Sequence, residues 1–463
     1  MIRRPGAPWP TQSAWPQSRR RFLGTSAALA GLGGLGGGLG LPRLGLGQDG
    51  PWTVRPDSDV DQLNFVVWTY GDIYTKISQQ FQEDWGVPVD STISSFNDHP
   101  TKLVTMFAGG ETIDVSQSSP FSFPNFIEQG LVEPLDGLPG IEDYVADFTP
   151  VTKQVAQFDG QTMGLPYFSA IWIWNYYEDL MEQAGIDQPF QDYDELIEQC
   201  VKAKTDGHSR YPILWVAGVG LEQLPGTWYS LTWNRGGRFF DDQGNHELGD
   251  GSIARETLKW WANTFEDGLD ISDPESLKVQ FTTSAKAYSA GQNIYRGPNH
   301  HYGLNIVNDP AQSPIAGKVK AHGFPGDGKT IGVTHVYFLT TAHRDKEWAW
   351  KLLQYLGGRD KSGEYTQAKN LARDAMLGSG YQSVMESDAV LEGWAPWGDP
   401  QQLLEMWGKA SYIGEPVSSV YEPWHFPWTD QLNIEVQKCL TGQITADECC
   451  DNLIAGIDRA KRG

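Results

Sequence analysis

Residues 63–68 read Leu-Asn-Phe-Val-Val-Trp, a nearly continuous apolar run. Such a run is typical of a strand that is buried on both faces, as the strands of a parallel sheet are. Apolar residues at helical spacing follow it, at Ile73, Ile77, Phe81 and Trp85. The pattern therefore predicts a buried strand and then an amphipathic helix that packs back onto the sheet.

The same alternation continues along the chain. It predicts strands at 87–93 and 113–115, a helix around 103–107 that ends at Gly109-Gly110, and a helix at 121–129. Strands are also expected at 171–176 and 333–340, and helices at 178–185, 193–204, 255–265 and 345–356, with a mostly helical C-terminal part. The βαβαβ order predicts an α/β fold with a parallel, doubly wound sheet.

Length and charge limit the possible functions. A chain of 463 residues is long enough for two domains with their own cores. Without residues 1–47, which hold six Arg and no acidic residue, 29 basic and 58 acidic residues remain, a net charge of −29. Such a surface repels nucleic acid and anionic lipid, so we expect no nucleic-acid partner.

The N-terminal segment has the pattern of an export signal. Ser18-Arg19-Arg20-Arg21-Phe22-Leu23 resembles the twin-arginine export motif, and an uncharged stretch rich in Ala, Gly and Leu follows to Leu41. We expect residues 1–47 to be a twin-arginine signal peptide, residues 48–57 to be a linker, and the protein to reach the periplasm. Because no cysteine follows the leader, no lipid anchor is expected.

Four cysteines remain in the exported part: Cys200, Cys439, Cys449 and Cys450. An oxidising compartment permits disulfides, and a capping box at Thr445-x-x-Glu448 predicts a helix start that could bring Cys439 near Cys449 or Cys450. Free buried thiols are the equal alternative. The cysteines lack the paired spacing of a zinc site, so neither a metal nor a cofactor is expected.

One match to a phosphate-binding pattern is set aside. Residues 323–330 fit GxxxxGK[ST], but that loop needs a following helix, and residues 331–341 are β-branched and aromatic like a strand. Pro325 also removes an amide donor. We expect a glycine-rich loop between two strands and no phosphate contact from Lys329. The sequence has no GxSxG and no HExxH.

The ends of the first three strands carry aromatic and neutral polar residues. In an open α/β sheet the ligand lies beyond the carboxyl ends of the strands. Aromatic faces and neutral hydrogen-bonding groups suit a polyhydroxylated ligand. The candidate ligand-binding residues at these ends are Trp68, Tyr70, Ser95, Phe96, Asn97, Gln117 and Ser118.

Four segments resemble one protein family. These are Gly164-Leu165-Pro166-Tyr167 with residues 173–176, the run 290–298 that ends in Arg296-Gly297-Pro298, the helix-like run 341–351, and residues 440–448. In this order they resemble the family-one extracellular solute-binding proteins, relatives of the maltodextrin-binding protein that serve bacterial ABC importers. The likeness covers roughly residues 60–460.

The resemblance implies a two-lobed periplasmic-binding-protein fold, in which each lobe is a doubly wound sheet flanked by helices and the solute lies in the cleft. Lobe one would hold residues 58–168 and 326–365, and lobe two residues 169–325 and 366–463. Further candidate ligand contacts follow: Tyr167, Trp228, Arg296, Asn299, His300, His335, Arg373, Trp424 and Trp428. Asn299-His300-His301 stands where relatives often have a sugar-stacking Trp, which disfavours a maltodextrin-like ligand.

The resulting hypothesis is a monomeric, non-enzymatic receptor that binds a saccharide or polyol and delivers it to an ABC permease. Two alternatives stay open. An exported carbohydrate-active enzyme, a lyase or a glycosidase, would need a carboxylate pair or a Tyr/His/Arg set in the cleft. A receptor for a cationic solute such as a polyamine would need several converging carboxylates, whereas the strand ends are mainly neutral.

Overall fold

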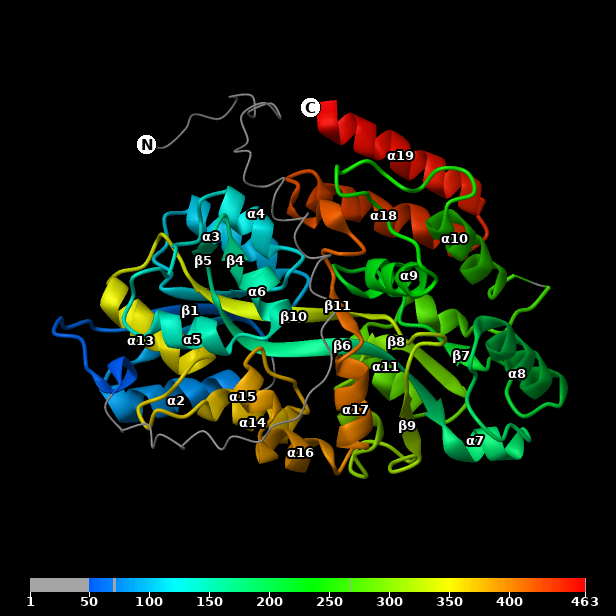
Figure 1. The fold of residues 1–463 in the computed structure, drawn as a ribbon, viewed down its shortest axis with the longest axis horizontal. Coiled ribbons are helices and arrows are strands. Elements are labelled where there is room, and N and C mark those ends of the chain that lie inside the picture. The colour runs from blue at the N-terminus through cyan, green and yellow to red at the C-terminus, as the bar shows by residue number, and fades with distance from the viewer. Residues whose placement is uncertain (1–49, 70–71, 267, 463) are drawn as a thin grey trace, which may run out of the picture.

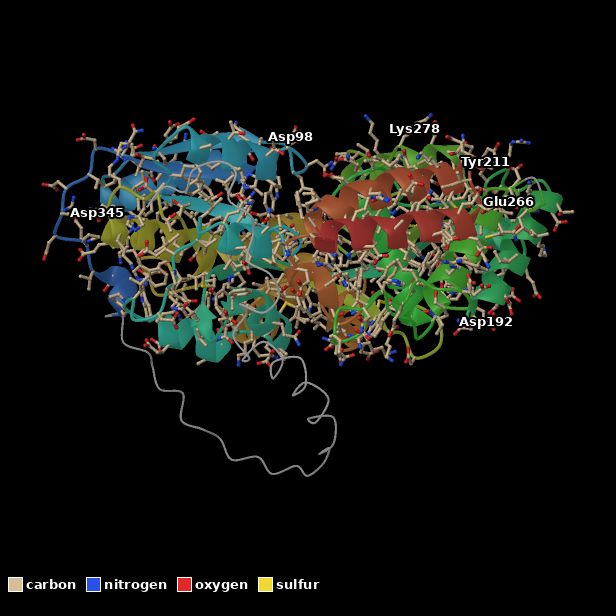
Figure 2. The ribbon with its side chains drawn as sticks, turned by 90° about the horizontal axis from the view of Figure 1, so that it is seen from above. Asp98, Asp192, Tyr211, Glu266, Lys278 and Asp345 are labelled. Carbon is tan, nitrogen blue, oxygen red and sulfur yellow. The ribbon has the colours of Figure 1, made fainter. Side chains whose placement is uncertain are left out.

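The computed structural model describes residues 50–69, 72–266 and 268–462, and shows two α/β lobes joined at a waist (Figures 1 and 2). Asp98 and Asp345 lie on one lobe, and Asp192, Tyr211 and Lys278 on the other (Figure 2). The expected two-lobed α/β fold is confirmed. The predicted leader, residues 1–47, lies outside the described residues.

The first lobe is built on the predicted βαβαβ unit. Strand β1 (Leu63–Trp68) pairs in parallel with β2 (Val89–Ser94) on one side and with β3 (Val115–Ser118) on the other. The sheet order is β2-β1-β3-β10-β6-β8-β7, with β11 beside β10 and β9 beside β6. Phe65, Val66 and Val67 are fully buried, as the apolar run predicted.

The sheet is mixed, although the alternation predicted only parallel neighbours. Strand β10 (Thr330–Leu339) runs antiparallel to both β3 and β6, and in the second lobe β6 runs antiparallel to β8 (Tyr295–His300) and β9 (Val319–His322). Only β7 (Ile213–Leu214) and β8, and β10 and β11 (Ala410–Tyr412), add further parallel pairs. The spacing of apolar residues indicates which side chains are buried, but it carries no information about the direction of neighbouring strands.

Strand β6 (Leu165–Tyr177) connects the two lobes. Its first half pairs with β10 and its second half with β8 and β9, so one strand of thirteen residues crosses the waist (Figure 1). Its first eleven residues are buried. The sequence predicted only residues 171–176 as a strand, because Pro166 and the polar Ser169 interrupt the apolar run of the first half.

Helices cover both lobes. Those of the first lobe are α2 (Ile73–Trp85), α3 (His99–Ala108), α4 (Phe123–Glu128), α5 (Ile141–Asp147), α6 (Pro150–Ala156) and α13 (Lys346–Gly357), with η3 (Pro51–Thr53) and the hairpin of β4 (Gln157–Phe158) and β5 (Gln161–Thr162). Those of the second lobe are α7 (Glu178–Gln183), α8 (Tyr193–Thr205), α9 (Gln223–Asn234), α10 (Ile253–Asn263), η4 (Pro274–Leu277), α11 (Phe281–Tyr288), α12 (Gly303–Val307), η5 (Ser418–Tyr421), α18 (His425–Leu440) and α19 (Ala446–Arg462).

Four helices lie near the waist: α14 (Thr366–Ala375), α15 (Gln382–Met385), α16 (Asp388–Trp394) and α17 (Pro400–Trp407) (Figure 1). The start of α15 is tied to the first lobe, because Ser383 donates to Asp147 through its hydroxyl and its amide, and Tyr381 packs on Phe148. Tyr381 and Ser383 belong to the stretch 366–385, which is predicted to be part of lobe two. The lobe boundaries stay a prediction.

Two local predictions are confirmed, and one open alternative is decided. The capping box forms, since the amide of Thr445 donates to Glu448 over 2.8 Å and the amide of Glu448 donates to the Thr445 hydroxyl over 3.1 Å. Strand β10 begins at Thr330, so residues 323–329 are a loop between two strands. All four cysteines are buried free thiols, which is one of the two alternatives left open.

Candidate functional site

The two lobes touch beside the start of α9. The Asn97 side-chain oxygen, in the loop after β2, accepts a hydrogen bond from the amide of Leu221 in the second lobe over 3.3 Å. The next residue, Glu222, is the N-cap of α9 and is fully buried. The carboxyl ends of the first-lobe strands therefore face the N-terminal end of this helix.

Glu222 is the centre of the candidate site. Neither of its carboxylate oxygens has a hydrogen-bond partner among the described residues. Oε1 lies 3.4 Å from Nε2 of His335, and Oε2 lies 3.7 Å from Nε2 of His300. The N-terminal end of α9 carries a partial positive charge, which favours a carboxylate there. A buried carboxylate that lacks hydrogen-bond donors is costly, so this position needs a further explanation.

The two histidines are arranged in the same way around Glu222. His300 Nδ1 lies 3.0 Å from the hydroxyl of Tyr302, and His335 Nδ1 lies 3.4 Å from the hydroxyl of Tyr167. Each Nε2 atom is buried and has no hydrogen-bond partner among the described residues. Tyrosine, imidazole, carboxylate, imidazole and tyrosine thus form one row that runs from the second lobe to the first.

Aromatic rings enclose this row. His300 stacks on Phe281 with ring centroids 4.1 Å apart and meets Trp172 edge-on at 5.3 Å. His335 packs on Phe168 at 4.4 Å and, edge-on, on Trp68 at 5.6 Å. The site therefore combines flat apolar faces with a small number of polar atoms, as ligand sites usually do.

Buried strands and one close helix contact position these groups. His335 lies on β10 opposite Phe168 of β6, and His300 lies on β8 opposite Trp172 of β6. Helix α9 packs directly on Trp172. Gly226 makes this close approach possible, since a Cβ atom added there would come within 2.3 Å of the indole ring. The Thr227 hydroxyl donates to the carbonyl of Val216 over 2.6 Å and fixes the helix to the preceding loop.

Burial keeps the rings of His300 and His99 neutral. It lowers the pKa of His300 well below the usual 6.5, and the nearby His335 and His301 lower it further. In the first lobe, burial lowers the pKa of His99 to about 4, partly offset by a hydrogen bond to the Gln117 carbonyl. At neutral pH these rings act as uncharged hydrogen-bonding groups.

The structure brings six of the predicted site residues to this place. Trp68, Phe96, Tyr167, His300 and His335 surround Glu222 or its histidines, and Asn97 lies at the seam between the lobes. Tyr70 lies outside the described residues. Gln117 contacts the backbone of Trp68: its side-chain amide donates to the Trp68 carbonyl over 3.3 Å.

The other predicted residues have contacts elsewhere. The exposed Ser95 hydroxyl donates to Asp98, and the buried Ser118 hydroxyl contacts Ser122. Arg373 is exposed on α14 and pairs with Asp374. The three tryptophans lie within the second lobe: Trp228 donates to the Ala254 carbonyl, Trp428 donates to the Leu453 carbonyl, and Trp424 packs on Phe240.

Arg296 and Asn299 form a separate buried group in the second lobe. The guanidinium donates through Nε and Nη2 to Asn175 and through Nη2 to Asn299, and it packs over the ring of Tyr288. Burial lowers the pKa of Arg296 to about 10, so it stays charged at neutral pH. Only Nη1 lacks a hydrogen-bond partner among the described residues.

Sequence reasoning missed Glu222, Phe168, Trp172, Phe281 and Tyr302. Glu222 had no distinguishing signal among 58 acidic residues.

In the described part of the chain, no three or more His, Cys, Asp or Glu side chains are arranged to hold a metal ion. The described helices include none that is both long enough and apolar enough to span a bilayer.

Comparison with known proteins identifies the family. The family model of the bacterial extracellular solute-binding protein matches residues 67–361. The chain belongs to this family. A binding protein of Brucella abortus (strain 2308) is 26% identical, and the match covers 68% of this chain and 76% of the relative. A Brucella suis biovar 1 (strain 1330) binding protein matches equally well.

Solved structures show the same fold. Maltose-bound MalE3 of T. maritima superposes with a TM-score of 0.72 at 20% identity, covering 86% of this chain and 99% of that one. An ABC-transporter solute-binding protein of Agrobacterium vitis S4 with bound D-mannitol gives 0.73 at 19% identity, covering 87% and 99%. The solute-binding family member therefore has the fold that the sequence resemblance implied.

Proposed function

We propose that this solute-binding protein is an exported receptor that captures a sugar or polyol between its lobes and delivers it to the permease of an ABC importer. The observation that carries the proposal is the enclosed row of polar groups around Glu222, which lies between the lobes and is walled by aromatic rings. Hydroxyl groups meet such polar atoms, and the carbon faces of a sugar or polyol meet such rings.

Relatives of the same fold support this class of ligand. One is described with maltose, one with D-mannitol, and one from Thermotoga lettingae TMO with α-D-tagatose at a TM-score of 0.73 and 17% identity. In this chain the ligand would contact first-lobe groups such as Trp68 and second-lobe groups such as Glu222. Binding would then shift the population of open and closed lobes toward the closed form.

We also propose that the protein is not an enzyme. Glycoside hydrolysis uses two carboxyl groups about 5–9.5 Å apart, whereas Glu222 is the one acidic side chain in the row described here. The Tyr/His/Arg alternative lacks its arginine in this row, because Arg296 belongs to the separate group with Asn175 and Asn299. The single carboxylate also argues against a polyamine, which needs several carboxylates. We propose that the receptor works as a monomer in the periplasm and that residues 1–47 direct its export.

A thermal-shift screen of sugars, alditols, amino acids and polyamines tests the proposal, because a ligand that binds only the folded state raises the melting temperature. We expect a rise of several degrees with at least one hydroxylated compound. Mass spectrometry of the recovered compound should show it unchanged. A shift with polyamines alone, or conversion of a saccharide, would contradict the proposed function.

A further inference from the structure

Four buried polar atoms face one another without hydrogen-bond partners among the described residues. They are Oε1 and Oε2 of Glu222, Nε2 of His300 and Nε2 of His335. They form two pairs, each of one carboxylate oxygen and one imidazole nitrogen, 3.4 and 3.7 Å apart. Both distances are too long for a good hydrogen bond between the groups themselves. Each pair is therefore left with unused hydrogen-bonding capacity.

We propose that Glu222 and its two histidines bind two adjacent hydroxyl groups of a polyhydroxylated solute. In this arrangement the Tyr302 and Tyr167 hydroxyls donate to the Nδ1 atoms, so each ring carries its proton on Nε2. Each pair then offers one acceptor, the carboxylate oxygen, and one donor, the Nε2–H. The assignment rests on the proposed function and specifies the chemical group that the site recognises.

A hydroxyl group satisfies such a pair completely. It can donate its hydrogen to the carboxylate oxygen over about 2.7 Å and accept from the Nε2–H over about 2.9 Å. Those two distances and the 3.4 Å between Glu222 Oε1 and His335 Nε2 close a triangle. Because the two pairs share one carboxylate, the two hydroxyl groups must lie close together. Adjacent hydroxyls of a sugar or alditol meet this requirement.

Charged ligands satisfy only half of the site. An ammonium group donates to the carboxylate but offers nothing to the two Nε2–H donors, since it has no acceptor. A ligand carboxylate would accept from the imidazoles but would be repelled by Glu222. The diol is the group that matches both atoms of each pair, which favours a neutral polyol over a polyamine.

Glu222→Gln tests the assignment, because it keeps the shape of the side chain and replaces one acceptor by a donor. Isothermal titration calorimetry would use D-mannitol, ribitol and D-tagatose as hydroxylated probes and spermidine as the cationic probe. Glu198→Gln is the matched control, since Glu198 is exposed on α8 of the same lobe. We expect the wild type to bind at least one hydroxylated probe, Glu222→Gln to weaken it by about thirtyfold or more, and Glu198→Gln to change it less than twofold.

Two further readouts separate recognition from folding. Gln has nearly the same size as Glu and removes no packing, so Glu222→Gln should keep about the wild-type melting temperature without ligand while binding more weakly. His335→Phe should also weaken binding, and its effect should not add to that of Glu222→Gln, because one hydroxyl contacts both residues.

The outcomes are distinguishable. If none of the three hydroxylated probes binds the wild type, the proposed function fails. If a hydroxylated probe binds the wild type and Glu222→Gln equally well, the function stands and the role of Glu222 is overturned. Tighter binding of spermidine than of every hydroxylated probe would also overturn the assignment.

Discussion

Nε2 of His335 lies 3.4 Å from Oε1 of Glu222, although His335 is on strand β10 beside the first-lobe strand β3 and Glu222 begins helix α9 of the second lobe. The distance is therefore a property of how the lobes are closed. Separation of the lobes would expose the carboxylate to water, which relieves the cost of its burial. A ligand that supplies hydrogen bonds to the same atoms favours the closed form.

Trp68→Ala should weaken ligand binding and also destabilise the first lobe. Trp68 ends β1, is 3% exposed, and meets Phe96, His99 and His335 edge-on. Loss of a buried aromatic costs about 3–5 kcal/mol of folding free energy. Loss of a binding hot spot costs about 2 kcal/mol, or thirtyfold in affinity. Urea unfolding and calorimetric titration measure the two effects.

Trp261→Ala is the matched control for Trp68. Trp261 is fully buried on α10 of the second lobe and packs on Trp215. It should lose similar folding stability and keep wild-type affinity. Equal affinity of a folded Trp68→Ala protein and the wild type would remove Trp68 from the binding site.

Apolar periodicity predicted the alternating strands and helices of an α/β fold, and the resemblance of four ordered segments to the solute-binding family implied the two lobes. The sequence also found one side of the site, since residues that end parallel strands, such as Trp68 and Asn97, must meet at one edge of the sheet. It could not find Glu222, Phe168 and Tyr302, which meet only after β6 crosses between the lobes. Contacts of this kind depend on strand direction and register, which periodicity does not encode.

Stability should fall as the pH drops from about 6.5 to 4. Burial lowers the folded-state pKa of His99 to about 4 and those of His301 and His425 to about 3, whereas the unfolded values stay at 6.5. The unfolded chain then binds more protons than the folded protein throughout this window. Each histidine thus contributes stability that is complete above pH 6.5 and is lost at about 1.4 kcal/mol per pH unit below it.

His99→Gln isolates one of these contributions. Urea unfolding at pH 7.5, 5.5 and 4.5 gives the free energy of unfolding at each pH. For His99→Gln this free energy should fall less steeply with decreasing pH than for the wild type, because about one proton fewer is bound on unfolding. The expected difference in loss of stability between pH 6.5 and 4 is about 3 kcal/mol. An unchanged slope would mean that His99 is not neutral in the folded protein.

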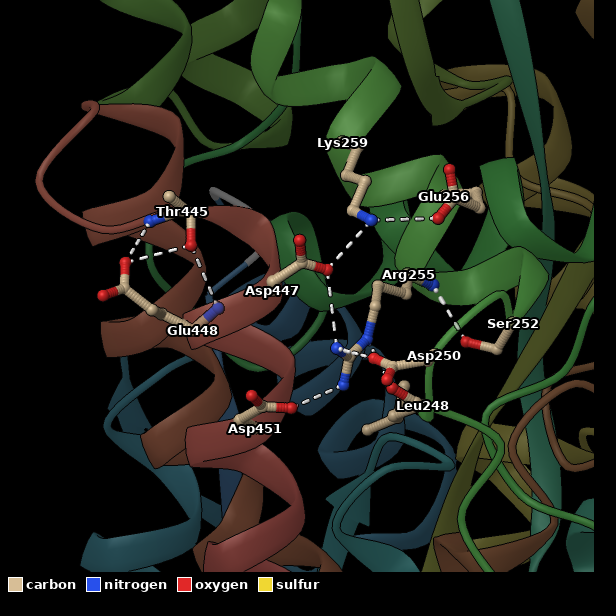
Figure 3. A network of polar contacts seen from close by, with 10 residues as sticks. All are labelled: Leu248, Asp250, Ser252, Arg255, Glu256, Lys259, Thr445, Asp447, Glu448 and Asp451. Atoms are coloured by element: carbon tan, nitrogen blue, oxygen red, sulfur yellow. Dashed lines mark hydrogen bonds and ion pairs between the residues drawn. The ribbon is translucent and has the colours of Figure 1, made fainter.

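Arg255→Met should destabilise the C-terminal helix α19 without changing the affinity for the ligand. The buried guanidinium of Arg255 on α10 contacts Asp250 at 2.6 Å, and Asp451 and Asp447 on α19 at 2.6 and 3.4 Å (Figure 3). The three carboxylates are exposed, so salt screens the pairs. We expect a loss of about 1–3 kcal/mol in low salt and a smaller loss in 1 M NaCl.

Lys259→Met is the control, because Lys259 also pairs with Asp447 but is itself largely exposed. It should lower the stability far less than Arg255→Met does, because solvent screens the Lys259 pair. Both variants should keep wild-type affinity, since the network lies on the outer helices of the second lobe. Hydrogen exchange of α19 amides would localise the effect, and unaltered exchange in Arg255→Met would contradict this role.

Export should depend on the arginine pair at Arg19 and Arg20. The joint change of both residues to Lys keeps the charge and removes the twin-arginine pattern. The precursor should then accumulate in the cytoplasm, as cell fractionation with an antibody would show. Normal delivery of the variant to the periplasm would contradict the twin-arginine route.

Gly226→Ala should disturb the site without touching any of its polar groups. A Cβ atom at this position of α9 would lie 2.3 Å from the Trp172 ring, so the helix or the indole must move. Movement of α9 displaces Glu222, one turn earlier, from its 3.4 Å and 3.7 Å positions beside the two histidines. We expect about tenfold weaker binding of a polyol and a loss of about 1–3 kcal/mol of stability from overpacking.

Gly249→Ala supplies the control, since a Cβ atom there meets nothing within 4 Å. It should leave both affinity and stability unchanged. The double variant Gly226→Ala, Trp172→Phe should regain part of the lost affinity, because the smaller ring removes the atoms that the added methyl group meets. Wild-type affinity in Gly226→Ala would show that the position of α9 does not set the geometry at Glu222, and that binding depends on the first-lobe strand ends alone.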